Sequence, residues 1–375
     1  MTVSLWQANN NQPTREVDFL VVGAGIVGCS AAYFAAQAGR QVVITDMRDL
    51  ALGASSRNAG MIVVGVDSNY PLPVFREMWA LSQRTQDFLL DMARRGNVPF
   101  SRSGSIALAE TSAEARELEQ QARLFDDEGI DCEYVSHDPF DRGWCAALRK
   151  PDDALVQPYE LVQAVYQQSG AELVANNELY HISQELPDVV TVYTRQFIFK
   201  ARHVLLCTNA YSVHIDPYFV GKVTPTRGQC LATAPLPNTP LLDNAACHSD
   251  HGYFYFRDTF DGRLLIGGGR KTNKILEGST TDDRTTEPVQ RTLEAYLYKH
   301  FPDIEAPIER RWAGIMGFSV DGLPLVGTLP DQPRVGFAVG FTGHGLALGA
   351  GTAERAVDML LKGASVGAVD VARLS

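Results

Sequence analysis

The chain has 375 residues, of which 45% are hydrophobic and 21% are charged, as in an average soluble globular protein. This length exceeds that of a typical single hydrophobic core, so we expect two domains. The formal net charge of −11 argues against the basic face that a nucleic-acid partner requires. No apolar run reaches the roughly 18 residues of a membrane-spanning helix, and residues 1–18 carry no basic-then-apolar leader. We therefore expect a cytoplasmic protein, either free or peripheral at a membrane.

A βαβ unit opens the predicted fold. Residues 18–22 are apolar and stop at a glycine, which is typical of a buried parallel strand. A helix is expected over residues 29–39 and a second strand over residues 41–45, ending at Asp46. The turn between the first strand and the helix reads Gly23-Ala-Gly25-Ile26-Val27-Gly28. A Gly-x-Gly-x-x-Gly turn in this context, with an acid 23 residues after Gly23, predicts a dinucleotide-binding site.

Each residue of this motif has an expected role. Gly23 permits the tight turn, and Gly25 lets the backbone approach a pyrophosphate held at the helix N-terminus. Gly28 allows close contact between the helix and the strand. Asp46 would accept hydrogen bonds from both ribose hydroxyls and would repel a 2′-phosphate, which disfavours NADP. The motif itself does not separate NAD from FAD.

The rest of the chain alternates predicted helices and strands. The expected helices cover residues 74–95, 111–127, 160–170 and 346–361. The expected strands cover residues 172–174, 189–193, 196–199, 203–206, 229–232, 253–257, 263–266 and 335–339. Parallel elements at both ends, with antiparallel strands between them, predict an α/β fold: a discontinuous Rossmann-like cofactor domain with an inserted, mainly antiparallel β-sheet substrate domain. The expected boundaries are 1–85, 150–225 and 310–375 for the first domain, and 86–149 and 226–309 for the second.

Six further segments occur in a characteristic order. They are Gly53–Met61, the stretch from Gln157-Pro158 to Val174, Pro225–Gln229, Trp312–Ile315, Asp321–Gly327 and Gly340–Gly345. In this order they resemble the superfamily of D-amino-acid, glycine and sarcosine oxidases, over about residues 17–363. The resemblance implies FAD as the cofactor. Sarcosine oxidases tether their flavin to a cysteine at the position of Gly314, so the resemblance implies non-covalent FAD here.

The resemblance also implies which residues meet the cofactor. Val174 would pack at the adenine end, residues 58–61 would line the isoalloxazine ring, and residues 340–346 would bring a helix N-terminus to the flavin N1–C2=O edge, where it stabilises the reduced anion. The expected cofactor residues are Gly23, Gly25, Ile26, Val27, Gly28, Asp46, Ser55, Arg57, Asn58, Ala59, Gly60, Met61, Val174, Asn209, Gly314, Gly340, Phe341, Thr342, Gly343, His344, Gly345 and Leu346.

The substrate pocket is expected on the inserted sheet. Tyr253, Tyr255 and Arg257 share one strand face by alternation, either as pocket residues or as a core stripe with a solvated arginine. His344 would either hydrogen-bond the flavin or cap the following helix. Arg57 completes the catalytic candidates.

Two carboxylate-binding residues of the superfamily are replaced. Met316 stands where amino-acid oxidases have an arginine, and Ala347 stands where sarcosine oxidases have a lysine. Either Arg57 or Arg257 serves instead, or the oxidised amine does not lie beside a carboxylate.

The resemblance implies an enzyme that oxidises the C–N bond of a primary or secondary amine or amino acid to an imine, by hydride transfer to flavin N5 and subsequent hydrolysis. The Ser-x-Arg-Asn-x-Gly loop, Asp261–Leu265 and Gly267–Gly269 resemble the γ-glutamylputrescine oxidase-like branch. The electron acceptor would be oxygen or a quinone. Two alternatives stay open: a 2-hydroxy-acid dehydrogenase that uses His344 or His251 as its base, and a non-catalytic flavoprotein subunit. Cys247, His248 and His251 are expected in a polar loop, without a metal.

Overall fold

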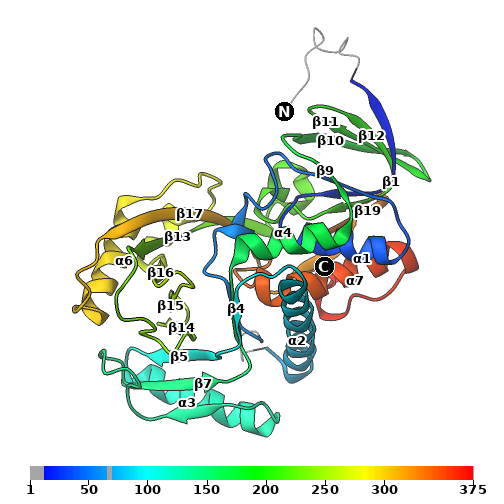
Figure 1. Cartoon of the computed structure of the whole chain (residues 1–375). Helices are drawn as coiled ribbons and strands as arrows, with labels where there is room; N and C mark the ends of the chain where they lie inside the picture. Colours follow the sequence, from blue (N-terminus) through cyan, green and yellow to red (C-terminus); the bar gives the residue numbers. More distant parts are fainter. Residues whose placement is uncertain (1–11, 66–69, 375) are drawn as a thin grey trace.

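The structure is a computed structural model that describes residues 12–65 and 70–374. It is a mixed α/β protein built around two large sheets (Figure 1). The sequence-based expectation about a leader concerns residues 1–18, most of which lie outside the described residues. No described helix is long and apolar enough to cross a membrane.

The first sheet has the strand order β10-β11-β12-β1-β2-β9, and β19 joins it by pairing with β12 and β18. The central strand β1 pairs in parallel with β12 and with β2, so that Val22 lies beside Leu206 of β12 and Thr45 of β2. Residues 19–22 of β1 are buried on both faces of the sheet, which explains their continuous apolar run. Its strands are β1 (Thr14–Val22), β2 (Val42–Thr45), β9 (Glu172–Val174), β10 (Leu179–Leu186), β11 (Val189–Thr194), β12 (Ile198–Leu206), β18 (Leu325–Leu329) and β19 (Gln332–Val339).

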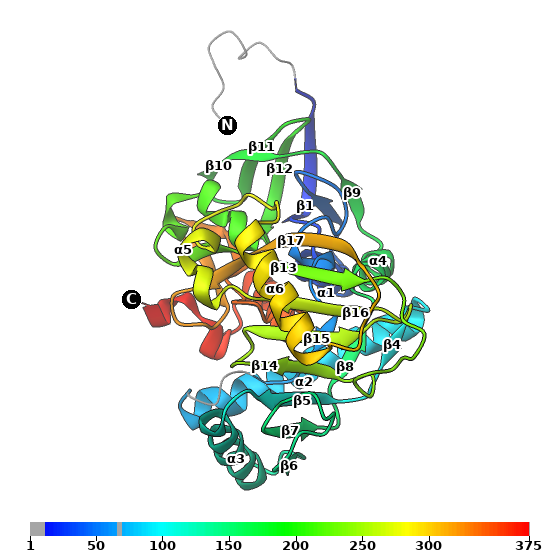
Figure 2. The ribbon, with the colours of Figure 1, turned by 90° about the vertical axis from the view of Figure 1, so that its left-hand side faces the viewer.

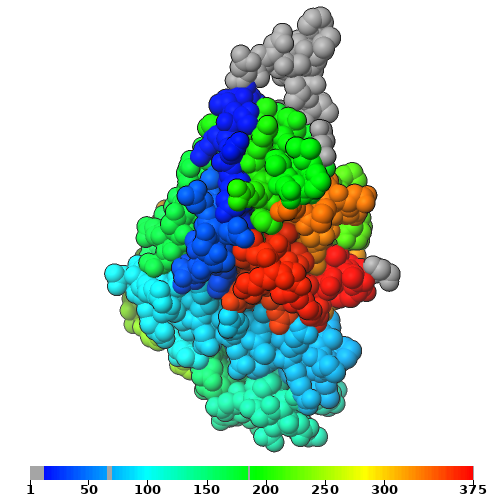
Figure 3. Space-filling view, turned by 90° about the vertical axis from the view of Figure 1, so that its right-hand side faces the viewer, coloured from blue at the N-terminus to red at the C-terminus, as the bar shows by residue number. Residues whose placement is uncertain are grey.

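Four helices share a core with the first sheet. They are α1 (Ile26–Gln37), α2 (Leu72–Arg95), α4 (Pro158–Ser169) and α7 (Gly345–Lys362). Helices α1 and α7 pack on the strands of this sheet, α4 packs against α1, and α2 packs against α7 and α4. Helix α1 packs against α7, so the two ends of the sequence meet. In Figure 3 the blue N-terminal part of the chain lies beside the red C-terminal part.

The second sheet has the strand order β17-β13-β16-β15-β14-β5-β7-β6 and is antiparallel except between β5 and β14. Figure 2 shows α6 (Glu287–His300) lying across its outer face, where Leu293 and Leu297 join the core of that sheet. Its strands are β5 (Ser105–Ala109), β6 (Glu133–Val135), β7 (Ala146–Lys150), β13 (Val223–Thr233), β14 (Ala246–Ser249), β15 (Phe254–Asp258), β16 (Leu264–Gly268) and β17 (Ile308–Ser319). Helix α3 (Ser112–Asp127) packs against β5, β6 and β7.

Short connecting elements join the two sheets. The strands β3 (Met61–Ile62), β4 (Phe100–Ser101) and β8 (Ala154–Val156) form a small third sheet. Strands β13 and β17 pair over their whole length and run across the expected boundaries at 225/226 and 309/310. We therefore keep the two-domain division as a proposal, with β13 and β17 as shared connections.

The predicted elements agree with the structure at the βαβ unit and differ in the middle. The predicted helix over residues 111–127 is confirmed as α3, and Thr111 Oγ1 accepts a hydrogen bond from the Glu114 amide at 3.2 Å. The prediction of two strands over residues 196–199 and 203–206 was wrong, because they form one strand, β12. Lys200 and Arg202 interrupt the apolar run, but they lie on alternate positions around buried Ala201. Among the described elements, helix α6 and ten strands were not predicted, the strands being β3, β4, β5, β6, β7, β8, β10, β14, β17 and β18.

Candidate flavin and substrate site

One cavity of about 1240 Å³ lies between the two sheets. Its lining includes Val22 and Cys207 at the carboxyl ends of β1 and β12, and it continues to Gly228, Tyr255 and Met316 on the second sheet. Small-molecule sites usually measure about 300–1,000 Å³. The cavity therefore has room for a large cofactor together with a small substrate.

The glycine-rich turn forms the first wall of this cavity. Gly23 has a φ of +109°, and a Cβ there would lie 2.6 Å from the Cys207 carbonyl oxygen. A Cβ at Gly28 would lie 1.8 Å from the Gly23 carbonyl oxygen. Ser55 Oγ accepts a hydrogen bond from the Ile26 amide at 2.9 Å, at the first turn of α1. The turn thus brings a helix N-terminus, with its amide groups and positive dipole end, to the cavity.

Asp46 lies directly after β2 and lines the same end of the cavity. Its Oδ2 accepts the Ala24 amide and its Oδ1 accepts the Arg48 amide, both at 2.8 Å. Each carboxylate oxygen has two lone pairs, so both can still accept a ribose hydroxyl. Burial raises the pKa of the Asp46 carboxyl, although the two backbone donors act in the opposite direction.

We predict that Asp46→Ala weakens FAD binding by about tenfold to a hundredfold. This range corresponds to the net loss of about one charge-assisted hydrogen bond, about 1.5–3 kcal/mol, at a point far from the reacting ring. The rate of flavin reduction in enzyme saturated with FAD should be unchanged. The lost interaction stabilises bound FAD equally before and during hydride transfer, so it affects binding and not the rate of that step. Flavin fluorescence titration and stopped-flow reduction measure the two effects. Asp49→Ala, an exposed acid three residues along, is the control and should bind FAD normally; a large loss of reduction rate in Asp46→Ala would contradict this placement.

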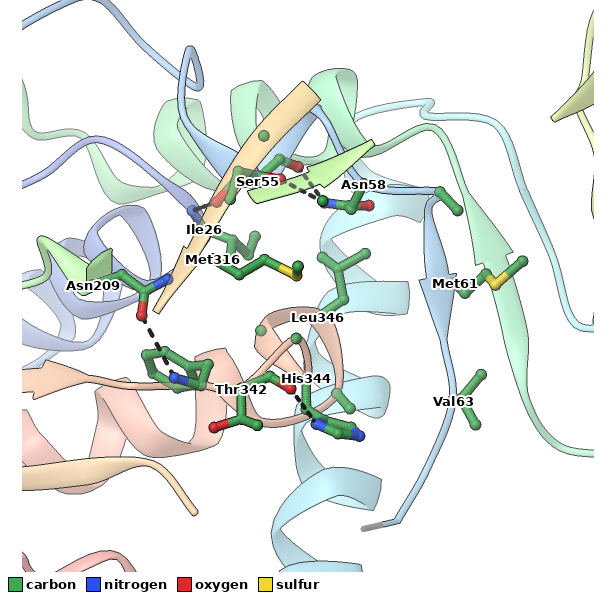
Figure 4. A pocket seen from close by; sticks show the side chains of 18 of the residues that line it. Ile26, Ser55, Asn58, Met61, Val63, Asn209, Met316, Thr342, His344 and Leu346 are labelled. Carbon is green, nitrogen blue, oxygen red and sulfur yellow. Dashed lines mark hydrogen bonds between the residues drawn. The ribbon is translucent and has the colours of Figure 1, made fainter. Parts of the chain in front are cut away.

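The loop over residues 53–61 is held in shape by Asn58. Its side-chain amide donates to the Ala54 and Ser55 carbonyl oxygens at 3.1 and 2.8 Å, and its Oδ1 accepts the Gly60 amide at 2.7 Å. Met61 follows in β3, and Figure 4 shows it on the cavity wall opposite Met316. The loop is therefore a preformed wall of the cavity.

The C-terminal segment contributes a second helix N-terminus. Asn209 Oδ1 accepts the amides of Gly340 and Phe341 at 3.0 and 3.5 Å, which fixes the turn before α7 (Figure 4). His344 occupies the N-cap position of α7, yet no side chain caps this helix. The His344 ring instead contacts the Thr342 carbonyl oxygen through Nδ1 at 3.0 Å. The helix N-terminus stays open towards the cavity, as an anionic reduced flavin requires.

These features fit the FAD that the sequence predicts: a glycine cradle that side chains would fill, a ribose acceptor and an uncapped helix N-terminus. Most of the predicted cofactor residues line the cavity: Gly23, Gly25, Ile26, Val27, Asp46, Ser55, Arg57, Asn58, Ala59, Met61, Asn209, Gly314, Phe341, Thr342, Gly343, His344, Gly345 and Leu346. Four do not reach its surface: Gly28, Gly60, Val174 and Gly340. Val174 contacts the site indirectly, because its carbonyl oxygen accepts the Asp46 amide at 3.2 Å.

One face of the second sheet covers the other half of the cavity. Strands β5, β14 and β15 are neighbours in this sheet. Ala107 of β5 lies opposite His248 of β14, and His248 lies opposite Tyr255 of β15. Paired residues point to the same face, and all three line the cavity. Burial raises the pKa of the Tyr255 phenol well above its ordinary value, so it stays neutral. In Figure 4 the Met316 side chain points into the space between Asn58 and Leu346.

Three of the candidate substrate residues either lie outside the cavity lining or are already bound to other groups of the protein. Arg257 is 3% exposed, does not line the cavity, and donates through one guanidinium nitrogen to the carbonyl oxygens of Ala59, Gly60 and Val156 at 3.1–3.2 Å. Tyr253 precedes β15 and also lies outside the lining. Arg57 lines the cavity, but it binds Asp283 at 2.9 Å and the Ala313 carbonyl oxygen at 2.8 Å. The two arginines therefore have structural partners.

Sequence reasoning missed two residues of the substrate half. His248 was placed in a polar loop, yet it lies in β14 and lines the cavity. Burial, with Lys150 and His344 nearby, lowers its pKa to about 4, so the imidazole is neutral. Arg270 directly follows Gly267–Gly269 and also lines the cavity; its position after that glycine run was the available signal. Within the described part of the chain, no three His, Cys, Asp or Glu side chains could hold a metal ion.

Comparison with known proteins agrees with this architecture. Glycine oxidase of Bacillus licheniformis is 24% identical and covers 92% of this chain and 94% of its own length. Gamma-glutamylputrescine oxidoreductase of Escherichia coli is 25% identical and covers 92% and 84%. The solved structure of glycine oxidase from Geobacillus kaustophilus superposes with a TM-score of 0.82 at 23% identity, over 96% of this chain and 98% of that one. Residues 18–359 match the family described as FAD dependent oxidoreductase (DAO), and the chain therefore belongs to this family of FAD-dependent oxidoreductases.

Proposed function

We propose that the protein oxidises the C–N bond of an amine or amino acid to an imine, which water then hydrolyses to a carbonyl compound and a free amine or ammonia. The observation that carries this proposal is the continuous cavity from the FAD-binding turn to Tyr255, Met316 and His248. The two relatives named above are an oxidase of glycine and an oxidoreductase of gamma-glutamylputrescine, both of them amine-bearing compounds. These names support the choice of an amine over other substrates.

Bound FAD supplies the acceptor for a hydride from the carbon beside the nitrogen. The chain must then bind the substrate, orient it and keep its nitrogen unprotonated. Lys150 of the second sheet lines the cavity but is paired with Asp153 at 3.0 Å, and Glu114 and Glu117 of α3 line the cavity as well. The neutral His248 imidazole lines the cavity and can hydrogen-bond the amine nitrogen.

The test is anaerobic reduction of the bound flavin by a panel of amines, amino acids and 2-hydroxy acids. We expect an amine-bearing compound to bleach the visible flavin absorbance within seconds, and hydroxy acids to leave it unchanged. Bleaching by hydroxy acids alone would refute the proposal. Photochemical reduction with deazaflavin is the control, because it shows that the bound flavin can accept electrons.

Oxidation of a 2-hydroxy acid is the second candidate. That reaction needs a base for the hydroxyl proton, and His344, one of the two bases proposed from the sequence, lines the cavity. His251, proposed as a base from the sequence, contacts Glu117 at 2.7 Å, which raises its pKa and favours the protonated form. We therefore keep His344 as the base in this alternative.

We predict that acid precipitation releases all of the flavin as free FAD. Gly314 occupies the tethering position and packs against Arg57, whose Cβ would lie 3.0 Å from a Cβ there. Cys207 lines the cavity at the glycine-rich turn, and burial raises the pKa of its thiol, which makes it a poor nucleophile. Absorbance of the supernatant and pellet measures the result; coloured protein in the pellet would contradict non-covalent binding.

A further inference from the structure

The cations that line the cavity differ in whether a carboxylate neutralises them. Among the described residues these cations are Arg48, Arg57, Lys150 and Arg270. The first two bind Asp283 at 3.2 and 2.9 Å, and Lys150 binds Asp153 at 3.0 Å. No described carboxylate forms an ion pair with Arg270. The charge of Arg270 is therefore free to bind an anionic group that enters the cavity.

Aromatic rings hold Arg270 in place. Its guanidinium carbon lies 5.2 Å from the ring centroid of Tyr253 and 5.2 Å from that of Phe318. Contacts with ring faces satisfy the flat guanidinium without using its N–H groups, which remain available for a carboxylate. Bidentate binding by a preorganised arginine gives both strength and direction. Tyr253, which does not line the cavity itself, thus supports the residue that does.

The position of Arg270 sets the length of the ligand. Phe318 follows Met316 by two residues on β17, so the two lie about 7 Å apart on one face of the strand. Met316 occupies the position of the carboxylate-binding arginine in amino-acid oxidases, according to the resemblance. An anion bound at Arg270 therefore lies beside the Phe318 ring, at a different place from the Met316 position where those enzymes hold a carboxylate.

The surroundings of Arg270 favour the same kind of ligand. The ammonium groups of Lys271 and Lys274 lie 5.5 and 5.3 Å from the Tyr253 ring centroid. Lys271 is paired with Asp250, whereas no described carboxylate forms an ion pair with Lys274. Arg270 and Lys274 thus place two cations without a described ion-pair partner beside one ring, and such charges attract anions.

We propose that Arg270 binds the carboxylate of the substrate, and that this carboxylate is separated by several carbons from the C–N bond that is oxidised. The substrate class is then an ω-amino acid or an amine conjugate with a distant carboxylate. This proposal rests on the proposed amine oxidation for the identity of the reacting group, but the anion site can be tested without turnover.

The binding test uses the oxidised holoenzyme and straight-chain carboxylates from acetate to hexanoate, with the corresponding amides as uncharged controls. Carboxylates should perturb the flavin spectrum, and the longer ones should bind more tightly than acetate. Arg270→Gln should weaken carboxylate binding at least tenfold and leave amide binding unchanged. Arg270→Lys keeps the charge without the bidentate geometry. Its affinity for carboxylates should lie between those of the wild type and Arg270→Gln.

Two controls test whether the effect belongs to Arg270. Arg291→Gln removes an exposed arginine of α6 whose partner is Glu287, and it should bind carboxylates like the wild type. Lys274→Gln should change binding less than threefold. Flavin content and melting temperature should match the wild type in every variant. Unchanged carboxylate binding in a folded, flavin-loaded Arg270→Gln, or an equal loss in Arg291→Gln, would overturn the proposal.

The kinetic test uses ω-amino acids with one to five methylene groups between nitrogen and carboxylate. Wild-type kcat/KM should rise with length beyond glycine, and Arg270→Gln should remove this dependence mainly through KM. A profile that peaks at glycine would overturn the distant-carboxylate assignment. Failure of every amine to reduce the flavin, with carboxylate binding still lost in Arg270→Gln, would refute the proposed function and support the anion site.

Discussion

Gly28→Ala is expected to yield protein that purifies without flavin. The added Cβ would lie 1.8 Å from the Gly23 carbonyl oxygen and 3.2 Å from a Val21 methyl group. Neither backbone nor a buried strand residue can move by that amount, so α1 must shift away from β1 and the amides of its first turn move with it. We expect FAD binding to weaken at least about a hundredfold, which is about 2.7 kcal/mol. Absorbance of the purified protein and titration of the apoprotein with FAD measure the loss.

Gly39→Ala is the matched control for this prediction. Gly39 follows α1 in the same βαβ unit and has a φ of +79°, but a Cβ there would meet nothing within 4 Å. Alanine in this conformation costs about 1–2 kcal/mol of stability without displacing the helix start. This variant should melt at a lower temperature and still bind FAD. Normal FAD content in Gly28→Ala would contradict the placement of the cofactor at this turn.

Glycine, sarcosine and D-alanine are expected to be poor substrates, with kcat/KM at least about a hundredfold below that of a longer amine-bearing carboxylate. A small zwitterion presents its carboxylate beside the reacting carbon, where Met316 and Ala347 offer no charge. A buried carboxylate without a partner costs several kcal/mol, and each tenfold in rate corresponds to about 1.4 kcal/mol. A longer substrate avoids this cost, because its carboxylate lies elsewhere.

Steady-state kinetics with the three small amino acids, beside polyamine and N-substituted amino-acid conjugates, measures this difference. Arg57→Ala and Arg257→Ala show whether either arginine binds a carboxylate after all. Since Arg57 holds Asp283 and Arg257 holds the loop at Ala59 and Gly60, both variants should lose flavin or stability before they lose specificity. High efficiency on glycine or sarcosine, unchanged in both variants, would refute this view of the pocket.

The dinucleotide half of the site could be predicted because its geometry is local. Gly23, Gly25 and Gly28 act within one turn, and the acid that ends β2 follows from the same βαβ pattern. The relevant contacts, such as the Ala24 amide on Asp46 at 2.8 Å, join residues of one supersecondary unit. A sequence pattern of this length therefore determines the local fold of this unit and the contacts within it.

The substrate half could be predicted only in part, because distant segments form it. Alternation correctly puts Tyr255 and Arg257 on one face of β15, but the loop at Ala59 and Gly60, almost 200 residues away, covers Arg257. His248 becomes a cavity residue through its register opposite Tyr255, and nothing near it in the sequence indicates that pairing. Period-2 patterns identify a face, whereas tertiary packing decides which part of that face is open.

The most direct measurement of the central claim is the stoichiometry of a single anaerobic turnover. Enzyme with its FAD is mixed with the amine that reduces it fastest, and flavin absorbance, carbonyl product and released amine or ammonia are quantified together. We predict one carbonyl and one released nitrogen compound for each flavin reduced, and slower reduction when the carbon beside the nitrogen carries deuterium. Flavin reduction without release of nitrogen, or with a hydroxy acid as the only reductant, would contradict the assignment of this protein as an oxidase or dehydrogenase of C–N bonds.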